Sequence, residues 1–342
     1  MSNQTPSVQE WKNLYERAME FKDIECWNYM YDCDVFGVQN PENGEIGYCC
    51  IMGNAGELFA LAVYLGAEGL EGLKRIQSGE KFASPTDVLH CQKCLMASFE
   101  DREYLEKKDL QVIRALGLKF RGHNSWPLFR NYLPGYSPWF LSSDEAIYLT
   151  LALRQVVAVA LRYKNNPEML NPPRENQFFV RVPKKDRDDF EWTDAWLEPS
   201  PLKETETVDV PVDEQRLEKI NRTIAQRQGI WEIDSFYSSR GVREKAQRPY
   251  YPYLTFCVEH HSGLILTFQL AKAAEHKSRF VGEFLNFVEN IEFLPKEILV
   301  KKEETFHLLE PIASNLGIRL VRVAGLPALE QARAAMARFL DR

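Results

Sequence analysis

The segment Lys119–Phe140 contains the densest gathering of residues that could do chemistry. Basic and aromatic side chains are interleaved along it, namely Arg121, His123, Trp126, Arg130 and Trp139. Guanidinium groups neutralise phosphate and aromatic rings stack on nucleobases, so this composition predicts a site for a phosphorylated ligand or nucleic acid. The alternative is a rigid loop whose rings anchor it to the core and whose arginines pair with carboxylates. We take the five residues as the candidate ligand-binding set.

A second chemical pattern is the pair Cys91 and Cys94, with Cys49 and Cys50 upstream. A C-x-x-C pair on a turn can supply two thiolates to zinc. Here the pair runs into Leu95–Phe99, which is typical of a strand, where a spacing of three sends side chains to opposite faces. We therefore predict that the cysteines are buried thiols, without disulfides and without a metal.

Residues 229–342 show the clearest periodicity of the chain, and it changes from strand to helix. Three strands are predicted first, at Ile230–Phe236, Tyr253–Val258 and Leu264–Leu270. Apolar residues then recur at helical spacing, and a strand, a helix, a strand and a final helix follow. This order predicts a five-stranded sheet in which Ile298–Val300 runs parallel to the first strand.

The order of elements resembles the ribonuclease-H-like fold of integrase and transposase catalytic cores. In that family three carboxylates converge on two divalent metals, so the resemblance implies Mg²⁺ as cofactor if the enzyme activity is retained. The matching positions are Asp234 on the first strand, Glu303 after the fourth strand and Glu330 in the last helix. Glu303 stands where the family has aspartate, and two lysines precede it. The alternative is that all three are ordinary strand-end and helix-start carboxylates.

Residues 1–164 are predicted to form a separate N-terminal α+β domain. Strands at Val35–Val38 and Ile46–Met52 form a hairpin with Asn43-Gly44 as its turn. The alanine-, leucine- and glycine-rich stretch that follows Gly53 indicates a helix.

A long helix near the end of that domain has a clear start, because Ser142 and Glu145 have the spacing of a capping box. Residues 165–228 are rich in proline and mixed charge, which predicts a connector with short elements. The predicted fold class is therefore α+β, with an N-terminal α+β domain and a ribonuclease-H-like α/β domain over residues 229–342.

Composition narrows the functional classes. The chain has 342 residues, of which 45% are hydrophobic and 27% charged, as in an ordinary soluble protein. Its net charge of −7 gives no general attraction to nucleic acid or to a membrane. The longest apolar run, Ala146–Leu161, is shorter than a bilayer span and is predicted to be a buried helix. Seven cysteines and a polar N-terminus without a signal peptide predict a cytoplasmic location.

A second resemblance covers most of the chain. The segments Phe120–Trp139, Gly53–Gly69 and Arg248–Pro252 are similar to an uncharacterised bacterial family that combines two domains of unknown function. This resemblance implies no activity, substrate or catalytic residue. We expect a non-catalytic binding or interaction protein with no cofactor and an unknown partner. The alternative is a metal-dependent nuclease or phosphoryl-transfer enzyme that uses the three carboxylates.

Overall fold

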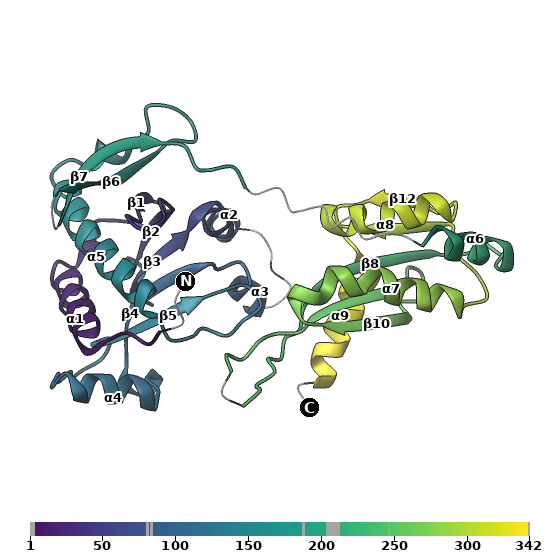
Figure 1. Cartoon of the computed structure of the whole chain (residues 1–342), viewed down its shortest axis with the longest axis horizontal. Helices are drawn as coiled ribbons and strands as arrows, with labels where there is room; N and C mark the ends of the chain where they lie inside the picture. The colour runs from purple at the N-terminus through teal and green to yellow at the C-terminus, as the bar shows by residue number, and fades with distance from the viewer. Residues whose placement is uncertain are drawn as a thin grey trace. The chain divides into compact units, whose positions relative to one another are not determined.

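The computed structural model describes residues 4–79, 82, 85–186, 189–202, 213–245 and 247–340. The chain divides into two compact units (Figure 1). Unit 1 comprises Met1–Pro134 and Pro138–Leu202, and unit 2 comprises Gly135–Ser137 and Lys203–Arg342. Each unit is a mixed sheet with helices packed on both faces, so the predicted α+β class is confirmed.

Unit 1 is built on a seven-stranded sheet with the order β5-β4-β3-β2-β1-β6-β7. Its strands are β1 (Phe36–Gln39), β2 (Ile46–Met52), β3 (Phe59–Leu65), β4 (Cys94–Glu100), β5 (Trp126–Tyr132), β6 (Phe178–Asp186) and β7 (Asp189–Leu197). Its helices are α1 (Val8–Asp23), α2 (Gly66–Gln77), α3 (Pro85–Leu89), α4 (Lys107–Ala115) and α5 (Ser143–Tyr163). Neighbouring strands are antiparallel, except that β1 and β6 are parallel.

The central strands of this sheet are buried on both faces, and alternate residues enter different cores. Leu61 and Val63 of β3 pack in the core formed with α1 and α5, which lie side by side in Figure 1. Tyr48 and Tyr64 point to the opposite face, where α2 supplies Leu70. The burial of both faces explains why these strands carry long apolar runs instead of a simple alternation.

Helix α5 is the main core helix of unit 1. Its start is the predicted capping box, in which the Ser142 side chain accepts from the Glu145 N–H and the Glu145 carboxylate accepts from the Ser142 N–H. Among the helices that the structure describes, α5 has the length and apolar composition of a membrane span. Of its most apolar window, 56% is buried inside the protein, and its fully buried Leu149, Leu153 and Val156 belong to the unit 1 core.

The stretch after Gly53 differs from the expected helix. Residues Phe59–Leu65 form β3, and helix α2 begins only at Gly66, whose φ of +62° favours glycine. The strand is buried between β2 and β4, and in that setting packing overrides the helical preference of alanine and leucine.

Helix α2 lies very close to the chain that leads into β4. A Cβ added at Gly72 would lie 1.9 Å from the carbonyl oxygen of Cys91, a backbone atom that cannot rotate away. We expect Gly72→Ala to lower the free energy of unfolding by about 2 kcal/mol, which urea denaturation would measure. Gly282 of unit 2 is the control, because an added Cβ there meets no atom within 4 Å. Equal losses at both positions would contradict the steric explanation.

The predicted connector 165–228 is corrected at both ends, although residues 203–212 lie outside the described part of the chain. Strand β6 pairs with β1 through Gly37 with Val180 and Val38 with Arg181, and β7 continues the sheet. Unit 1 therefore extends to Leu202 and not to residue 164. Proline did not exclude this pairing, because Pro183 lies beyond the two residues that pair with β1.

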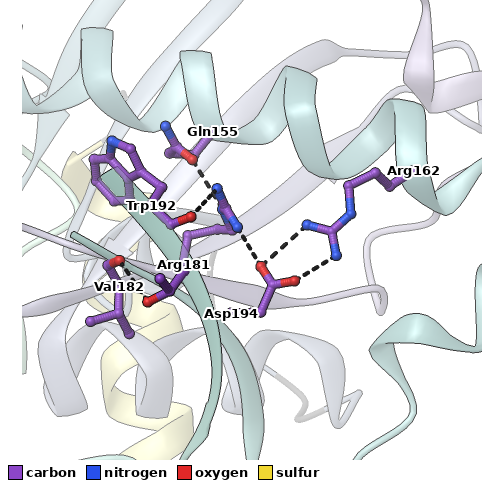
Figure 2. Close-up of polar contacts among 7 residues, drawn as sticks. Gln155, Arg162, Arg181, Val182, Trp192 and Asp194 are labelled. Carbon is purple, nitrogen blue, oxygen red and sulfur yellow. Dashed lines mark hydrogen bonds and ion pairs between the residues drawn. The ribbon is translucent and has the colours of Figure 1, made fainter. Parts of the chain in front are cut away.

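A network of arginines fastens the β6–β7 hairpin to α5 (Figure 2). Asp194 of β7 forms ion pairs with Arg181 of β6 and with Arg162 of α5, the latter at 2.6 Å. The Arg181 side chain also donates to Gln155 Oε1 at 3.0 Å and to the Trp192 carbonyl at 3.2 Å. The hydrogen bond from Arg162 is the main reason that the pKa of Asp194 is lowered. The connector interpretation missed these contacts because they join residues 11 to 32 positions apart.

Unit 2 confirms the predicted five-stranded sheet, with the order β10-β9-β8-β11-β12. Its strands are β8 (Ile230–Tyr237), β9 (Tyr253–Glu259), β10 (Ile265–Ala271), β11 (Glu297–Val300) and β12 (Arg319–Arg322). Its helices are α6 (Glu214–Thr223), α7 (His276–Glu289), α8 (Glu303–Asn315) and α9 (Pro327–Leu340). The first three strands pair antiparallel, and β11 runs parallel to β8 as predicted; β11 is also parallel to β12.

The sheet of unit 2 separates two cores. Trp231 and Ile233 of β8 face a core that contains residues of α6, α7 and α8. Phe236 faces the other side, where Leu326 and Leu329 at the start of α9 cover the sheet. Helix α6 thus belongs to this unit, and the domain begins before the predicted residue 229.

Candidate functional site

Asp234 lies on β8, near the end where the parallel strands β8 and β11 finish. Its side chain is only 13% exposed, and its Oδ1 lies 3.4 Å from the ammonium group of Lys302. Lys302 is the residue immediately before α8; its ammonium group donates to the carbonyl of Ser235 and lies 5.8 Å from the ring centroid of Tyr253. The carboxylate therefore has a protein cation as its partner.

The other two predicted carboxylates have different surroundings. Glu303 is the first residue of α8, and its exposed side chain pairs with Arg322 at 3.2 Å and His307 at 3.7 Å. Glu330 is exposed in the first turn of α9. Throughout the described ranges, no group of three or more His, Cys, Asp or Glu side chains could hold a metal ion. The structure thus places Asp234, Glu303 and Glu330 on the predicted elements but does not gather them into a metal site.

These surroundings do not fit the divalent metal that the fold family implies. A metal held by Asp234 would have to share the carboxylate with the Lys302 ammonium, and like charges at such short range repel strongly. Glu303, moreover, is paired with an arginine of its own.

A buried carboxylate that sequence reasoning did not single out lies two residues before Asp234. Glu232 is fully buried, and its Oε1 lies 2.6 Å from Nδ1 of His260. Its Oε2 accepts the backbone N–H of Leu329 at 2.7 Å, in the first turn of α9. A carboxylate at that position accepts from a backbone N–H that has no partner within the helix, and its negative charge interacts favourably with the helix dipole. This contact ties His260, in the turn after β9, to the buried side of the sheet.

A second buried polar cluster joins β8, β9 and α7 on the opposite face of the sheet. Nε2 of His276 lies 3.0 Å from the Ser235 hydroxyl and 2.8 Å from the Thr255 hydroxyl, and the two hydroxyls are 2.8 Å apart. Burial lowers the pKa of His276 to about 4, so the imidazole is neutral at pH 7. All three side chains are buried, so the cluster connects α7 to strands β8 and β9 inside the unit and is not exposed to a substrate.

In unit 1, the centre of the predicted binding segment is a strand. Residues Trp126–Tyr132 form β5, which pairs with β4, so the expectation of a loop across this stretch is corrected. Trp139 continues the pairing through two backbone hydrogen bonds with Asn131, at 2.8 and 2.9 Å. The proline and tryptophan density here reflects an edge strand packed on the core.

Arg130 was predicted to contact a ligand at the surface, but it is buried. Its side chain is buried and donates two hydrogen bonds to the carboxylate of Asp109, at 2.9 and 2.7 Å. Phe140 lies against the guanidinium, with its centroid 4.5 Å away. The pair links β5 to α4, and Arg130 is therefore a structural residue whose partner lies 21 residues earlier in the chain.

The remaining members of the set lie in or beside the turn that precedes β5. Arg121 and His123 are exposed, whereas Trp126 is half-buried with the Arg102 guanidinium 5.9 Å from its ring centroid. His123 pairs with Asp101 at 3.0 Å; this hydrogen bond raises the pKa of His123 and lowers that of Asp101. Only Arg121 and His123 thus keep their charged or polar groups at the surface.

The cysteines lie mostly inside the two units. All seven are thiols, not disulfides, and all except Cys33 are buried. Burial raises the pKa of Cys26 and Cys50 to about 12, so these thiols are protonated and unreactive at neutral pH.

The strand order and the two-sided helix cover define the class: a two-unit α+β protein whose second unit has the strands expected from the resemblance to the ribonuclease-H-like fold. A family model described as domain of unknown function DUF7309 matches residues 11–181, and a second, domain of unknown function DUF6930, matches residues 216–337. The chain therefore belongs to the DUF7309 family and carries a DUF6930 domain after it. Neither domain has a known function, as the second sequence resemblance implied.

Among solved structures, the chain is similar to the HTLV-2 integrase catalytic core domain in complex with magnesium, in its trimeric form. The identity is 16% and the TM-score 0.27, over 34% of this chain and 72% of that chain. No curated protein matches the chain. This distant likeness concerns shape and does not establish catalysis, so the surroundings of Asp234 are the more direct guide to function.

Proposed function

We propose that this protein is a non-catalytic binding or interaction protein. The observation that supports the proposal is the Lys302 ammonium, 3.4 Å from the Asp234 carboxylate. Two-metal phosphoryl transfer requires carboxylates free to bind cations, with the ions roughly 4 Å apart. In this chain an internal lysine neutralises the first carboxylate, and the second pairs with Arg322.

The exposed residues Arg121 and His123 remain the proposed ligand-contacting groups of unit 1. Their chemistry suits a phosphorylated ligand or nucleic acid, although the net charge of −7 means that the attraction would have to be local. A cytoplasmic location and a bacterial source are part of the same proposal. The seven thiols are compatible with a reducing compartment.

Metal binding separates this proposal from the nuclease alternative. Isothermal titration of the full chain with Mn²⁺ is expected to show no saturable site that depends on Asp234, and Asp234→Asn should give the same heats as the wild type. Incubation with single- and double-stranded DNA and RNA in Mg²⁺ or Mn²⁺ is expected to leave the nucleic acid intact.

Metal-dependent cleavage that disappears in both Asp234→Asn and Glu303→Gln would establish the enzyme alternative and refute a non-catalytic role. A matched control is Glu310→Gln, since Glu310 is an exposed carboxylate on α8 that pairs only weakly with His307 at 3.7 Å. The control should leave any cleavage unchanged, so that a loss at the other two positions reports on the site and not on net charge.

A further inference from the structure

The two sheets end in four edge strands, and three of these edges carry features that oppose pairing with another chain. Strand β12 has four residues and an arginine at each end, β7 carries Glu191 and Asp194, and β5 contains Pro127. Short length, charge and proline are the usual ways in which proteins protect a sheet edge. The fourth edge, β10 of unit 2, has none of them: the stretch Ser262–Ala271 contains no charged residue and no proline.

Strand β10 also exposes large apolar side chains. Phe268 is 60% exposed and Leu270 53%, and Leu264 just before the strand is 63% exposed. Phe268 and Leu270 pair with Phe256 and Leu254 of β9, and therefore lie on the face of the sheet that α9 covers over β8 and β9. Exposed apolar residues that continue a buried face mark an interaction surface more often than isolated ones do.

We propose that β10 pairs with β10 of a second copy of this chain, antiparallel and about a two-fold axis. The register shift of β10 lies between Ile265 and Thr267, so Thr267–Ala271 is the regular part available for pairing. Centring the pair on Gln269 places Phe268 of one copy opposite Leu270 of the other, twice, on the same face of a continuous ten-stranded sheet.

The chemistry of the edge favours a second copy as the occupant. A two-fold interface brings each patch against itself, so any charge at its centre would meet a like charge. Here the centre is neutral, and the nearest charge, Lys272, lies three residues from the axis and pairs with Glu244 at 3.6 Å in its own chain. Each cross-strand pair of an aromatic and an aliphatic side chain stabilises a sheet only modestly, so we expect an affinity in the micromolar range and not an obligate dimer.

The test is the molar mass of the full chain by light scattering or sedimentation, over a concentration series up to about 100 μM. The wild type is expected to shift from monomer to dimer, and the double variant Phe268→Lys, Leu270→Lys to bind at least tenfold more weakly with an unchanged circular dichroism spectrum. Leu161→Lys is the control, because Leu161 is an apolar residue of unit 1 with 50% exposure. A wild type that stays monomeric throughout would refute the proposal.

A cross-link tests the register. In the pair centred on Gln269, the two Gln269 Cα atoms lie about 4.5–5.5 Å apart, within the range of a disulfide. Gln269→Cys in a Cys33→Ser background is therefore expected to form a disulfide dimer on mild oxidation, whereas Ser262→Cys should not. A dimer that forms equally with either cysteine, or that survives the double lysine substitution, would overturn pairing through β10. Neither experiment involves Asp234 or Lys302, so the outcome is separate from that of the metal test.

Discussion

Replacement of Arg130 by alanine is expected to lower the free energy of unfolding by about 3–5 kcal/mol. The guanidinium donates two hydrogen bonds to Asp109, and both side chains are about nine-tenths buried. Removal of the arginine would leave the Asp109 carboxylate buried without its main counter-charge, which costs more than the pair itself contributes. Chemical denaturation followed by tryptophan fluorescence would measure the change.

Two further variants make the result specific. Arg121→Ala, nine residues earlier and exposed, is expected to change stability by no more than about 0.5 kcal/mol. The double variant Asp109→Leu, Arg130→Met removes both charges together and should recover much of the loss. If Arg130→Ala is as stable as the wild type, Arg130 is not a structural residue and becomes a candidate binding residue again.

The stability of unit 2 is expected to fall as the pH is lowered from about 6.5 towards 4, because of His276. The folded pKa of this histidine is about 4, against 6.5 for the unburied group, so the unfolded chain binds a proton in this interval while the folded chain does not. The stability contributed by the neutral imidazole is fully present above pH 6.5 and is lost as the pH falls to 4. A pKa shift from 6.5 to about 4 corresponds to a loss of about 3 kcal/mol in the free energy of unfolding over this pH interval.

The measurement is the free energy of unfolding of the wild type and of His276→Gln at several pH values between 4 and 7. Carboxylates also titrate here, so the informative quantity is the difference between the two proteins. That difference should shrink steadily as the pH falls, because only the wild type must keep a buried imidazole neutral. A constant difference from pH 7 to 4 would show that His276 titrates normally in the folded state.

The candidate carboxylates show how far sequence reasoning reaches. Periodicity placed Asp234 on the first strand of unit 2, Glu303 after the fourth strand and Glu330 in the last helix, and each lies on that element. Whether the three converge depends on side-chain directions and on which cations lie nearby. Lys302 contacts Asp234 although the two residues are 68 positions apart in the sequence. The sequence around either residue does not indicate this contact.

Local sequence patterns predict the five strands of unit 2 and the parallel pairing of β8 with β11, the hairpin β1–β2 and the capping box of α5, because hydrophobic period, turn residues and caps act over a few residues. They fail where one segment is completed by another that is remote in the chain. Strand β6 joins β1 across more than a hundred residues, and Glu232 receives the N–H of Leu329 97 residues away. In each case many residues of the right type were available, and only the docking of helices and strands on a common core selected the partner. This docking makes Arg130 a structural residue, pairs Asp234 with Lys302, and leaves β10 as the exposed apolar edge.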